Sequence, residues 1–176
     1  ATMTNSNKSN HVSVMKKIQN LKKIKILLTD VDGVLTDGGM YYTPDGDYMK
    51  KFNARDGMGI NLLKRNEIPT VIVTKEKTVM VKNWAKKMNI DYVFDGIQKK
   101  EKILEKICIK YKIGIPEIGY IGDDVNDLEL LKKVGFSATP KDGIIQAQRI
   151  VNYVCKKNGG CGAFREVVDL ILDSIA

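Results

Sequence analysis

Short apolar runs alternate with amphipathic stretches along most of the chain. Runs of β-prone residues, each closed by a polar turn, indicate strands at residues 24–29, 70–73, 92–94, 118–121, 136–138 and 151–155. Apolar side chains at helical spacing indicate helices at residues 58–66, 77–89, 99–112 and 128–134, near Ile144, and at residues 164–175. Strands that alternate with helices form right-handed βαβ units. We therefore predict an α/β fold in three layers, with a parallel sheet between two layers of helices.

One segment, residues 38–53, departs from this alternation. Its two β-prone arms, residues 40–43 and 48–52, flank the turn residues 44–46 (Pro-Asp-Gly), which predicts a β-hairpin inserted after the first strand. A two-stranded ribbon is only marginally stable alone. We expect this hairpin to pack against another subunit, although a simple surface hairpin would have the same sequence.

The charge of the chain is concentrated near its N-terminus. The formal net charge is +8, and six of the 29 basic residues lie within residues 1–25, which contain no acidic residue. The remaining 23 basic residues are nearly balanced by 21 acidic ones. No basic stripe with interleaved aromatic residues indicates a nucleic-acid surface. We predict a flexible basic leader over residues 1–22, one domain over residues 23–176, and no nucleic-acid partner.

Composition and hydropathy also indicate the cellular compartment of the protein. The 176-residue chain is 43% hydrophobic, which is enough for the core of one domain. No apolar run approaches the roughly 18 residues that span a bilayer, and residues 1–20 lack the apolar region of a signal peptide. The three cysteines, Cys108, Cys155 and Cys161, match neither a disulfide framework nor a zinc site. We expect a cytoplasmic protein that does not bind membranes.

The first predicted strand ends in two acidic residues, Asp30 and Asp32, within the sequence Asp-Val-Asp-Gly. In open α/β sheets, ligands bind at the carboxyl ends of the strands. An extended backbone would point both carboxylates to one side, with the carbonyl of Val31 between them. These oxygen ligands suit Mg²⁺, and two like charges this close need a cation. A solvated turn after a buried strand is the alternative interpretation.

Other strand ends carry residues that fit the same chemistry. Thr74 follows one strand, a lysine at position 99 or 100 follows the next, and Asp123 and Asp127 follow a third. Because the carboxyl ends of parallel strands meet at one edge of a sheet, we expect these side chains to come together. A hydroxyl, an ammonium, several carboxylates and a divalent cation are the components of a phosphoryl-transfer site.

These residues carry a specific resemblance. The chain resembles the haloacid dehalogenase superfamily, whose four motifs correspond here to residues 30–37 (DVDGVLTD), Thr74, Lys100 and residues 122–127 (GDDVND). The resemblance covers nearly all of residues 24–176 and implies a Rossmann-like fold. With a short hairpin and no segment long enough for a large cap domain, the chain is similar to the capless phosphatases of 2-keto-3-deoxy sugar acids. These are the 3-deoxy-manno-octulosonate 8-phosphate phosphatases and the phosphatases of neuraminate-like nonulosonate 9-phosphates.

The resemblance implies a role for each motif residue. Asp30 is expected to be the nucleophile that forms an aspartyl-phosphate. Asp32 is expected to protonate the leaving oxygen and then to deprotonate the water that hydrolyses the intermediate. Thr74 would hydrogen-bond the phosphate, and Lys100 would neutralise its charge. The expected ligands of the Mg²⁺ cofactor are Asp30, Asp32 together with its adjoining backbone, Asp123 and, in support, Asp127 or Asn126.

The resemblance also implies substrate contacts and an oligomer. Residues 53–59 (NARDGMG) resemble the family's substrate loop, and residues 159–166 (GGCGAFRE) resemble its Gly-Gly…Arg-Glu segment. Arginine suits planar recognition of a carboxylate, although ordinary ion pairs would account for the same arginines. In the family, four hairpins come together and a neighbour completes each site, which implies a homotetramer. The expected substrate-binding residues are Asn53, Arg55, Gly57, Glu76, Lys100 and Arg165.

Departures from the family pattern leave two substrates open. Thr74 is followed by Lys-Glu, where the octulosonate phosphatases usually have Gly-Arg. The glutamate at position 76 resembles the pattern of the nine-carbon-acid phosphatases, in which a glutamate at this position would contact the sugar. Residues 55–57 (Arg-Asp-Gly) resemble the octulosonate group instead. The sequence therefore supports a broader description, a phosphatase of 2-keto-3-deoxy sugar acid phosphates.

Two other classes of protein share parts of this pattern. Similar domains fused to acylneuraminate cytidylyltransferases can serve as non-catalytic tetramerisation modules, but this chain retains every motif residue. Phospho-receiver domains also place acids, a threonine and a lysine at strand ends. Their acidic pair precedes a lone acceptor aspartate on a middle strand, whereas here the second acidic cluster comes late. The order of the motifs therefore argues against a receiver domain.

Overall fold

A computed structural model describes residues 19–176 of the chain. Residues 1–18, which make up most of the predicted leader, lie outside the described residues. The last leader residues, 19–22, are helical, and the side chain of Leu21 is buried in the core. Among the described residues, no helix has both the length and the apolar character that crossing a membrane requires.

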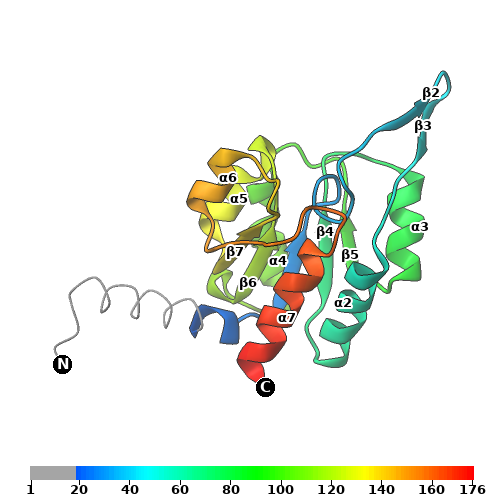
Figure 1. The fold of residues 1–176 in the computed structure, drawn as a ribbon. Coiled ribbons are helices and arrows are strands. Elements are labelled where there is room, and N and C mark those ends of the chain that lie inside the picture. The colour runs from blue at the N-terminus through cyan, green and yellow to red at the C-terminus, as the bar shows by residue number, and fades with distance from the viewer. Residues whose placement is uncertain (1–18) are drawn as a thin grey trace.

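A six-stranded sheet forms the centre of the molecule (Figure 1). Its strand order is β5-β4-β1-β6-β7-β8, and every neighbouring pair is parallel. The buried strand β1 lies near the middle, which fits its uninterrupted apolar sequence. The strands are β1 (Ile26–Thr29), β4 (Thr70–Val73), β5 (Tyr92–Phe94), β6 (Ile118–Ile121), β7 (Phe136–Thr139) and β8 (Tyr153–Val154).

Helices cover both faces of this sheet, and the alternation of side chains along β1 shows why. Leu27 belongs to a core cluster with α2, α3 and α7, whereas Ile26 and Leu28 belong to a second cluster with α4, α5 and α6. The three-layer α/β architecture predicted from the sequence is therefore confirmed, and no large cap domain is present within residues 19–176. The helices are α2 (Ala54–Arg65), α3 (Val79–Lys87), α4 (Leu104–Tyr111), α5 (Leu128–Lys133), α6 (Ile145–Ile150) and α7 (Ala163–Ile175).

The first helix after the hairpin begins earlier than the sequence pattern indicated. We expected residues 53–57 to form a polar loop, but α2 starts at Ala54. Asn53 caps this helix, because its side-chain oxygen accepts a hydrogen bond from the backbone N–H of Arg55 at 2.9 Å. Tertiary packing then continues the helix through Gly57 and Gly59, where apolar periodicity is weak. The predicted substrate loop is thus the first turn of a helix.

Short 3₁₀ helices account for the remaining differences. The predicted helix at residues 99–112 is divided into a 3₁₀ turn, η1 (Lys100–Ile103), and the α-helix α4. Two further turns, η2 (Ile115–Glu117) and η3 (Val125–Asp127), flank β6. The turns η1 and η3 contain the polar residues that follow β5 and β6, at the carboxyl ends of these strands.

The predicted hairpin is present and projects from the body of the domain (Figure 1). Its strands, β2 (Tyr41–Thr43) and β3 (Gly46–Met49), pair antiparallel in a separate two-stranded sheet. The second arm starts two residues earlier than predicted, so that Pro44 and Asp45 form the turn. Apolar side chains along this ribbon are exposed, and they are Met40, Tyr42, Tyr48 and Met49.

We predict a clear difference between two isoleucines of α4. Ile107 is fully buried between the helix and the sheet, whereas Ile109 is 72% exposed. Ile107→Ala should lower the free energy of unfolding by about 2–5 kcal/mol, because it removes buried methylenes and leaves a cavity. Ile109→Ala should change it by no more than about 0.5 kcal/mol. Urea unfolding of both variants measures the contrast, and equal losses would contradict the assigned packing of α4.

Candidate active site

The predicted chemical residues meet at the carboxyl ends of β1, β4 and β6. The chain runs from β1 to β4 on one side and later returns to β6 on the other, so this edge contains a topological switch point. A small cavity of about 150 Å³ opens there. Its lining residues are Asp30, Asp32, Thr74, Lys75, Glu76, Asp123, Asp124 and Asn126.

Asp30 lies directly after β1 and is almost completely buried. Its backbone N–H donates to the carbonyl of Ile121 at 3.0 Å, which continues the pairing of β1 with β6. Its carboxylate Oδ1 accepts from the backbone N–H of Val31 at 2.7 Å and pairs with Lys100 Nζ at 2.9 Å. The orientation of this carboxylate is therefore fixed by two donors.

Lys100 is the cation at the centre of the cluster. It is fully buried in the 3₁₀ turn η1, whereas the neighbouring Lys99 is exposed. Its Nζ lies 2.6 Å from Asp127 Oδ1 and donates to the Tyr120 hydroxyl at 3.3 Å, in addition to its pair with Asp30. Burial acts to lower the pKa of Lys100, but the two neighbouring carboxylates outweigh burial and raise it. Lys100 therefore stays protonated.

Three carboxylates face one another closely enough to share a cation. Oxygens of Asp30, Asp123 and Asp127 all lie within 4.8 Å of one another. Burial, followed by the charge of Asp127, raises the pKa of Asp30 to about 7. Burial, followed by the charges of Asp30 and Asp127, raises the pKa of Asp123 to about 8. These acids repel one another more than Lys100 alone compensates.

The hydrogen bonds of the cluster show where a cation fits. Asp123 Oδ1 is buried and has no hydrogen-bond partner among the described residues. Asp127 differs, because its Oδ1 accepts from Lys100 and Tyr120 and its Oδ2 accepts from the backbone N–H groups of Asp123 and Asp124. Asp30 and Asp123 therefore have more free acceptor capacity for a hard cation than Asp127, which orients the loop and Lys100.

Two expectations about the Asp-Val-Asp-Gly sequence are wrong. We expected an extended backbone through residues 30–32, but β1 ends at Thr29 and the chain turns immediately afterwards, and both carboxylates still line the same small cavity. The Val31 carbonyl accepts from three backbone N–H groups, those of residues 34–36, and so it is not free to bind a metal. The Asp32 carboxylate lies outside the group of three acids and pairs instead with Lys50, at 2.7 Å.

Three of the predicted substrate-binding residues, Glu76, Arg55 and Arg165, divide between two cavities. Glu76 and Thr74 line the cavity of the acids. Arg55 and Arg165 line a second cavity of about 540 Å³, alongside residues of the β8–α7 segment, and Arg165 Nε pairs with Asp169 at 2.7 Å. Within one chain, the structure therefore does not bring these arginines into the acidic cavity.

Asn53 and Gly57 have structural partners. Besides capping α2, Asn53 donates from Nδ2 to the carbonyl of Gly160 at 3.2 Å. Gly57 lies against Met88, whose Sδ would be 2.6 Å from an added Cβ. Both residues thus hold α2 in place beside its neighbours, and neither lines the acidic cavity.

Two close contacts explain the glycines around the acids. Gly33 has a φ of +85°, and an added Cβ would lie 1.9 Å from Asp123 Oδ2. A Cβ on Gly159 would lie 1.9 Å from the carbonyl oxygen of Gly33. Gly160 also donates its N–H to the carbonyl of Val34 at 2.9 Å. The segment before α7 therefore packs directly on the turn that carries the acids.

Sequence reasoning missed two residues of this site. Tyr120 is a buried strand residue whose hydroxyl donates a hydrogen bond to Asp127. A tyrosine within an apolar strand could have indicated it, because a buried hydroxyl usually has a hydrogen-bond partner. Lys50 follows the hairpin and bonds both Asp32 and Glu76. Nothing in the local pattern distinguishes it from Lys51, because its partners lie 18 and 26 residues away in the chain.

We predict that Lys100 stabilises the fold as well as the site. Lys100→Met leaves Asp30 and Asp127 buried without their cation, and this should lower the free energy of unfolding by about 3–5 kcal/mol at neutral pH. The adjacent exposed Lys99 supplies the matched control, and Lys99→Met should have an effect of at most about 0.5 kcal/mol. Urea unfolding distinguishes the two. Equal stability of the two variants would contradict the buried ion-pair assignment.

Comparison with known proteins adds independent information. Residues 93–164 match the family of haloacid dehalogenase-like hydrolases. The chain is 34% identical over 156 residues to the 3-deoxy-D-manno-octulosonate 8-phosphate phosphatase of Haemophilus influenzae, a match that covers 89% of this chain and 87% of that protein.

Solved structures give the same result. The cobalt-bound form of the Haemophilus influenzae phosphatase superposes with a TM-score of 0.87 at 34% identity, covering 89% of this chain and 92% of that one. The Moraxella catarrhalis phosphatase, in complex with magnesium, phosphate and 3-deoxy-D-manno-octulosonate (KDO), has a TM-score of 0.87 at 35% identity, covering 90% and 91%. The chain therefore belongs to the haloacid dehalogenase-like hydrolases, within the group of phosphomonoester hydrolases that contains the 3-deoxy-D-manno-octulosonate 8-phosphate phosphatases.

Proposed function

We propose that this protein is a Mg²⁺-dependent phosphatase that hydrolyses 3-deoxy-D-manno-octulosonate 8-phosphate (KDO 8-phosphate) through an aspartyl-phosphate on Asp30. The observation that carries the proposal is the position of the Asp30 carboxylate. It is fixed by Lys100 at the switch point of the sheet, beside the unpartnered oxygen of Asp123. A nucleophile, a fixed cation and a vacant acceptor for a metal are the requirements of metal-assisted phosphoryl transfer.

The donor set supports Mg²⁺ as the cofactor. Carboxylate oxygens are hard ligands, and Asp30 and Asp123 would hold the ion while Asp127 keeps the loop in place. When bound, Mg²⁺ supplies charge neutralisation for the phosphate and for the clustered acids. Without such neutralisation, the acids lining the cavity would repel a phosphate dianion.

Two carboxylates have separate roles in the reaction, one as the nucleophile and the other as the acid and base. Asp30 attacks phosphorus in line, and the bond from phosphorus to the sugar oxygen breaks as the new P–O bond forms. Asp32 donates a proton to the departing sugar oxygen and then accepts one from the water that attacks the aspartyl-phosphate. Thr74 is buried at the rim and is positioned to hydrogen-bond a phosphate oxygen, while Lys100 balances its charge.

Two observations favour the eight-carbon substrate. The relatives that share about a third of their residues with this chain are named octulosonate 8-phosphate phosphatases, and one of them was solved with KDO bound. Glu76 was the residue that suggested a nine-carbon acid. Its carboxylate pairs with Lys50 at 3.2 Å, so its presence is explained without a contact to the sugar.

We further propose a cytoplasmic homotetramer in which neighbours complete each site. The exposed apolar side chains of the hairpin, including Tyr42 and Tyr48, support burial against another subunit. Arg55 and Arg165 face a cavity apart from the acids, which fits a contribution to a neighbour's substrate site better than to their own.

The central prediction concerns the nucleophile. With Mg²⁺ present, the wild-type protein should hydrolyse p-nitrophenyl phosphate, and Asp30→Asn should abolish this activity because an amide is a poor nucleophile. Glu105 is exposed on α4 and does not line the acidic cavity, so Glu105→Gln, which makes the same change from carboxylate to amide, should retain most of the activity. Release of p-nitrophenol measures the rates. A wild-type tetramer without turnover would favour the non-catalytic tetramerisation module instead.

A second measurement addresses the substrate. Phosphate release from KDO 8-phosphate should have a kcat/KM at least about tenfold above that from a nonulosonate 9-phosphate, a difference of about 1.4 kcal/mol in transition-state binding. Equal slow rates on both compounds would contradict a dedicated sugar-acid phosphatase. A preference for the nine-carbon compound would overturn the choice of substrate while leaving the chemistry intact.

A further inference from the structure

Lys50 is a half-buried lysine beside the reaction site, and the phosphatase proposal leaves its role unassigned. It follows β3 at the base of the hairpin, and only 8% of its side chain is exposed. Its Nζ lies 2.7 Å from Asp32 Oδ1 and 3.2 Å from Glu76 Oε2. Burial acts to lower the pKa of Lys50, but hydrogen bonds and charge from these two carboxylates raise it, so the ammonium is retained.

The backbone around Lys50 is held on both sides. The pairing of β2 with β3 fixes the residues before it. After it, the ring of Phe52 stacks on Trp84 with centroids 4.2 Å apart and planes 9° from parallel. Asn53 is bonded to the carbonyl of Gly160. A lysine side chain is flexible, so an anchored backbone and two carboxylate partners are what confine its ammonium to one place.

The two lysines of the site, Lys50 and Lys100, have the same arrangement. Lys100 joins Asp30 to Asp127, and Lys50 joins Asp32 to Glu76. In each case one partner is an acid of the Asp-Val-Asp-Gly turn and the other is an acid from a different strand end. Each carboxylate of the turn is therefore oriented by a cation of its own.

We propose that Lys50 is a positioning residue that holds the Asp32 carboxylate in line with the leaving oxygen, and that Glu76 acts by fixing Lys50 rather than by binding substrate. This inference rests on the proposed function, because it assigns Lys50 to the proton-transfer step of that reaction. The turn after β1 leaves Asp32 outside the group of three acids, and Lys50 and Thr36 are its side-chain hydrogen-bond partners among the described residues. The bond to Thr36, at 3.5 Å, is the weaker of the two.

The geometry predicts a dependence on the leaving group. Phenol is a poorer leaving group than p-nitrophenol, so phenyl phosphate needs proton donation more than p-nitrophenyl phosphate does. Lys50→Met should lower kcat/KM about 10- to 100-fold on phenyl phosphate and about threefold or less on p-nitrophenyl phosphate, because kcat/KM covers only the steps up to departure of the leaving group, before Asp32 acts as a base. KM should change by less than about threefold on both, because Lys50 acts on Asp32 and not on the phosphate.

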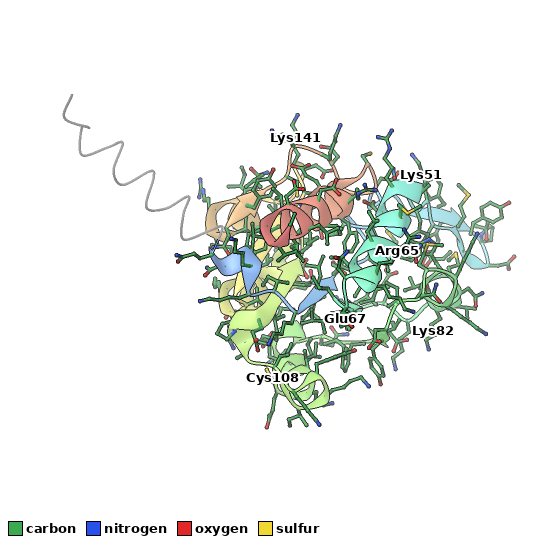
Figure 2. All side chains as sticks on the ribbon, turned by 90° about the horizontal axis from the view of Figure 1, so that it is seen from below. Lys51, Arg65, Glu67, Lys82, Cys108 and Lys141 are labelled. Atoms are coloured by element: carbon green, nitrogen blue, oxygen red, sulfur yellow. The ribbon has the colours of Figure 1, made fainter. Side chains whose placement is uncertain are left out.

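Two further variants serve as rescue and control. Lys50→Arg keeps the charge and should restore most of the lost phenyl phosphate activity. Lys51→Met alters an exposed neighbour at the same hairpin base and should leave both rates unchanged (Figure 2). The ratio of the two kcat/KM values does not depend on the fraction of enzyme that is folded, so it remains informative if Lys50→Met is destabilised.

The outcomes separate the inference from the function on which it rests. Equal losses of kcat/KM on both aryl phosphates would mean a purely structural role, and a large rise in KM would mean that Lys50 binds substrate. Either result overturns the inference while the wild-type protein still turns over. A wild-type protein without activity on either compound would remove the proposed function itself, and the role of Lys50 with it.

Discussion

The structure depends on the balance of charge at one edge of its sheet. Asp30, Asp123 and Asp127 converge there within a few ångströms, and a fully buried lysine compensates only part of their charge. Such a cluster is costly in a folded protein unless cations neutralise it. The same imbalance that opposes folding is what prepares the site for a divalent ion and a phosphate. Stability and chemistry therefore depend on the same few side chains.

The fold produces this cluster through topology rather than through local sequence. β1 carries the first acids, and β4 and β6 flank it on opposite sides. All three strands are parallel, so their carboxyl ends meet at one edge. Helices on both faces bury the strands and exclude water from beneath the acids. Lys50, at the base of the hairpin, bonds Asp32 and Glu76 at this edge. The inserted hairpin therefore contributes a side chain to the site in addition to its exposed surface.

The sequence allowed us to predict site residues that come directly after a strand. It did not allow us to predict site residues whose partners lie in distant segments of the chain. The apolar runs correctly located the strands, and the polar residues after them identified Asp30, a lysine at position 99 or 100 and Asp123 as neighbours. The backbone at residues 30–32 was predicted wrongly, because the chain turns directly after Thr29 instead of remaining extended, and Asp32 reaches the cavity from that turn. Lys50 was missed because only the folded chain brings it to its partners.

The contact between Gly159 and the carbonyl of Gly33 has a consequence for biosynthesis. Chains emerge from the ribosome N-terminal end first, so the turn with the acids is made long before the glycine segment that packs against it. The turn that carries Asp30 and Asp32 therefore reaches its packed position only after residues 159 and 160 have been made.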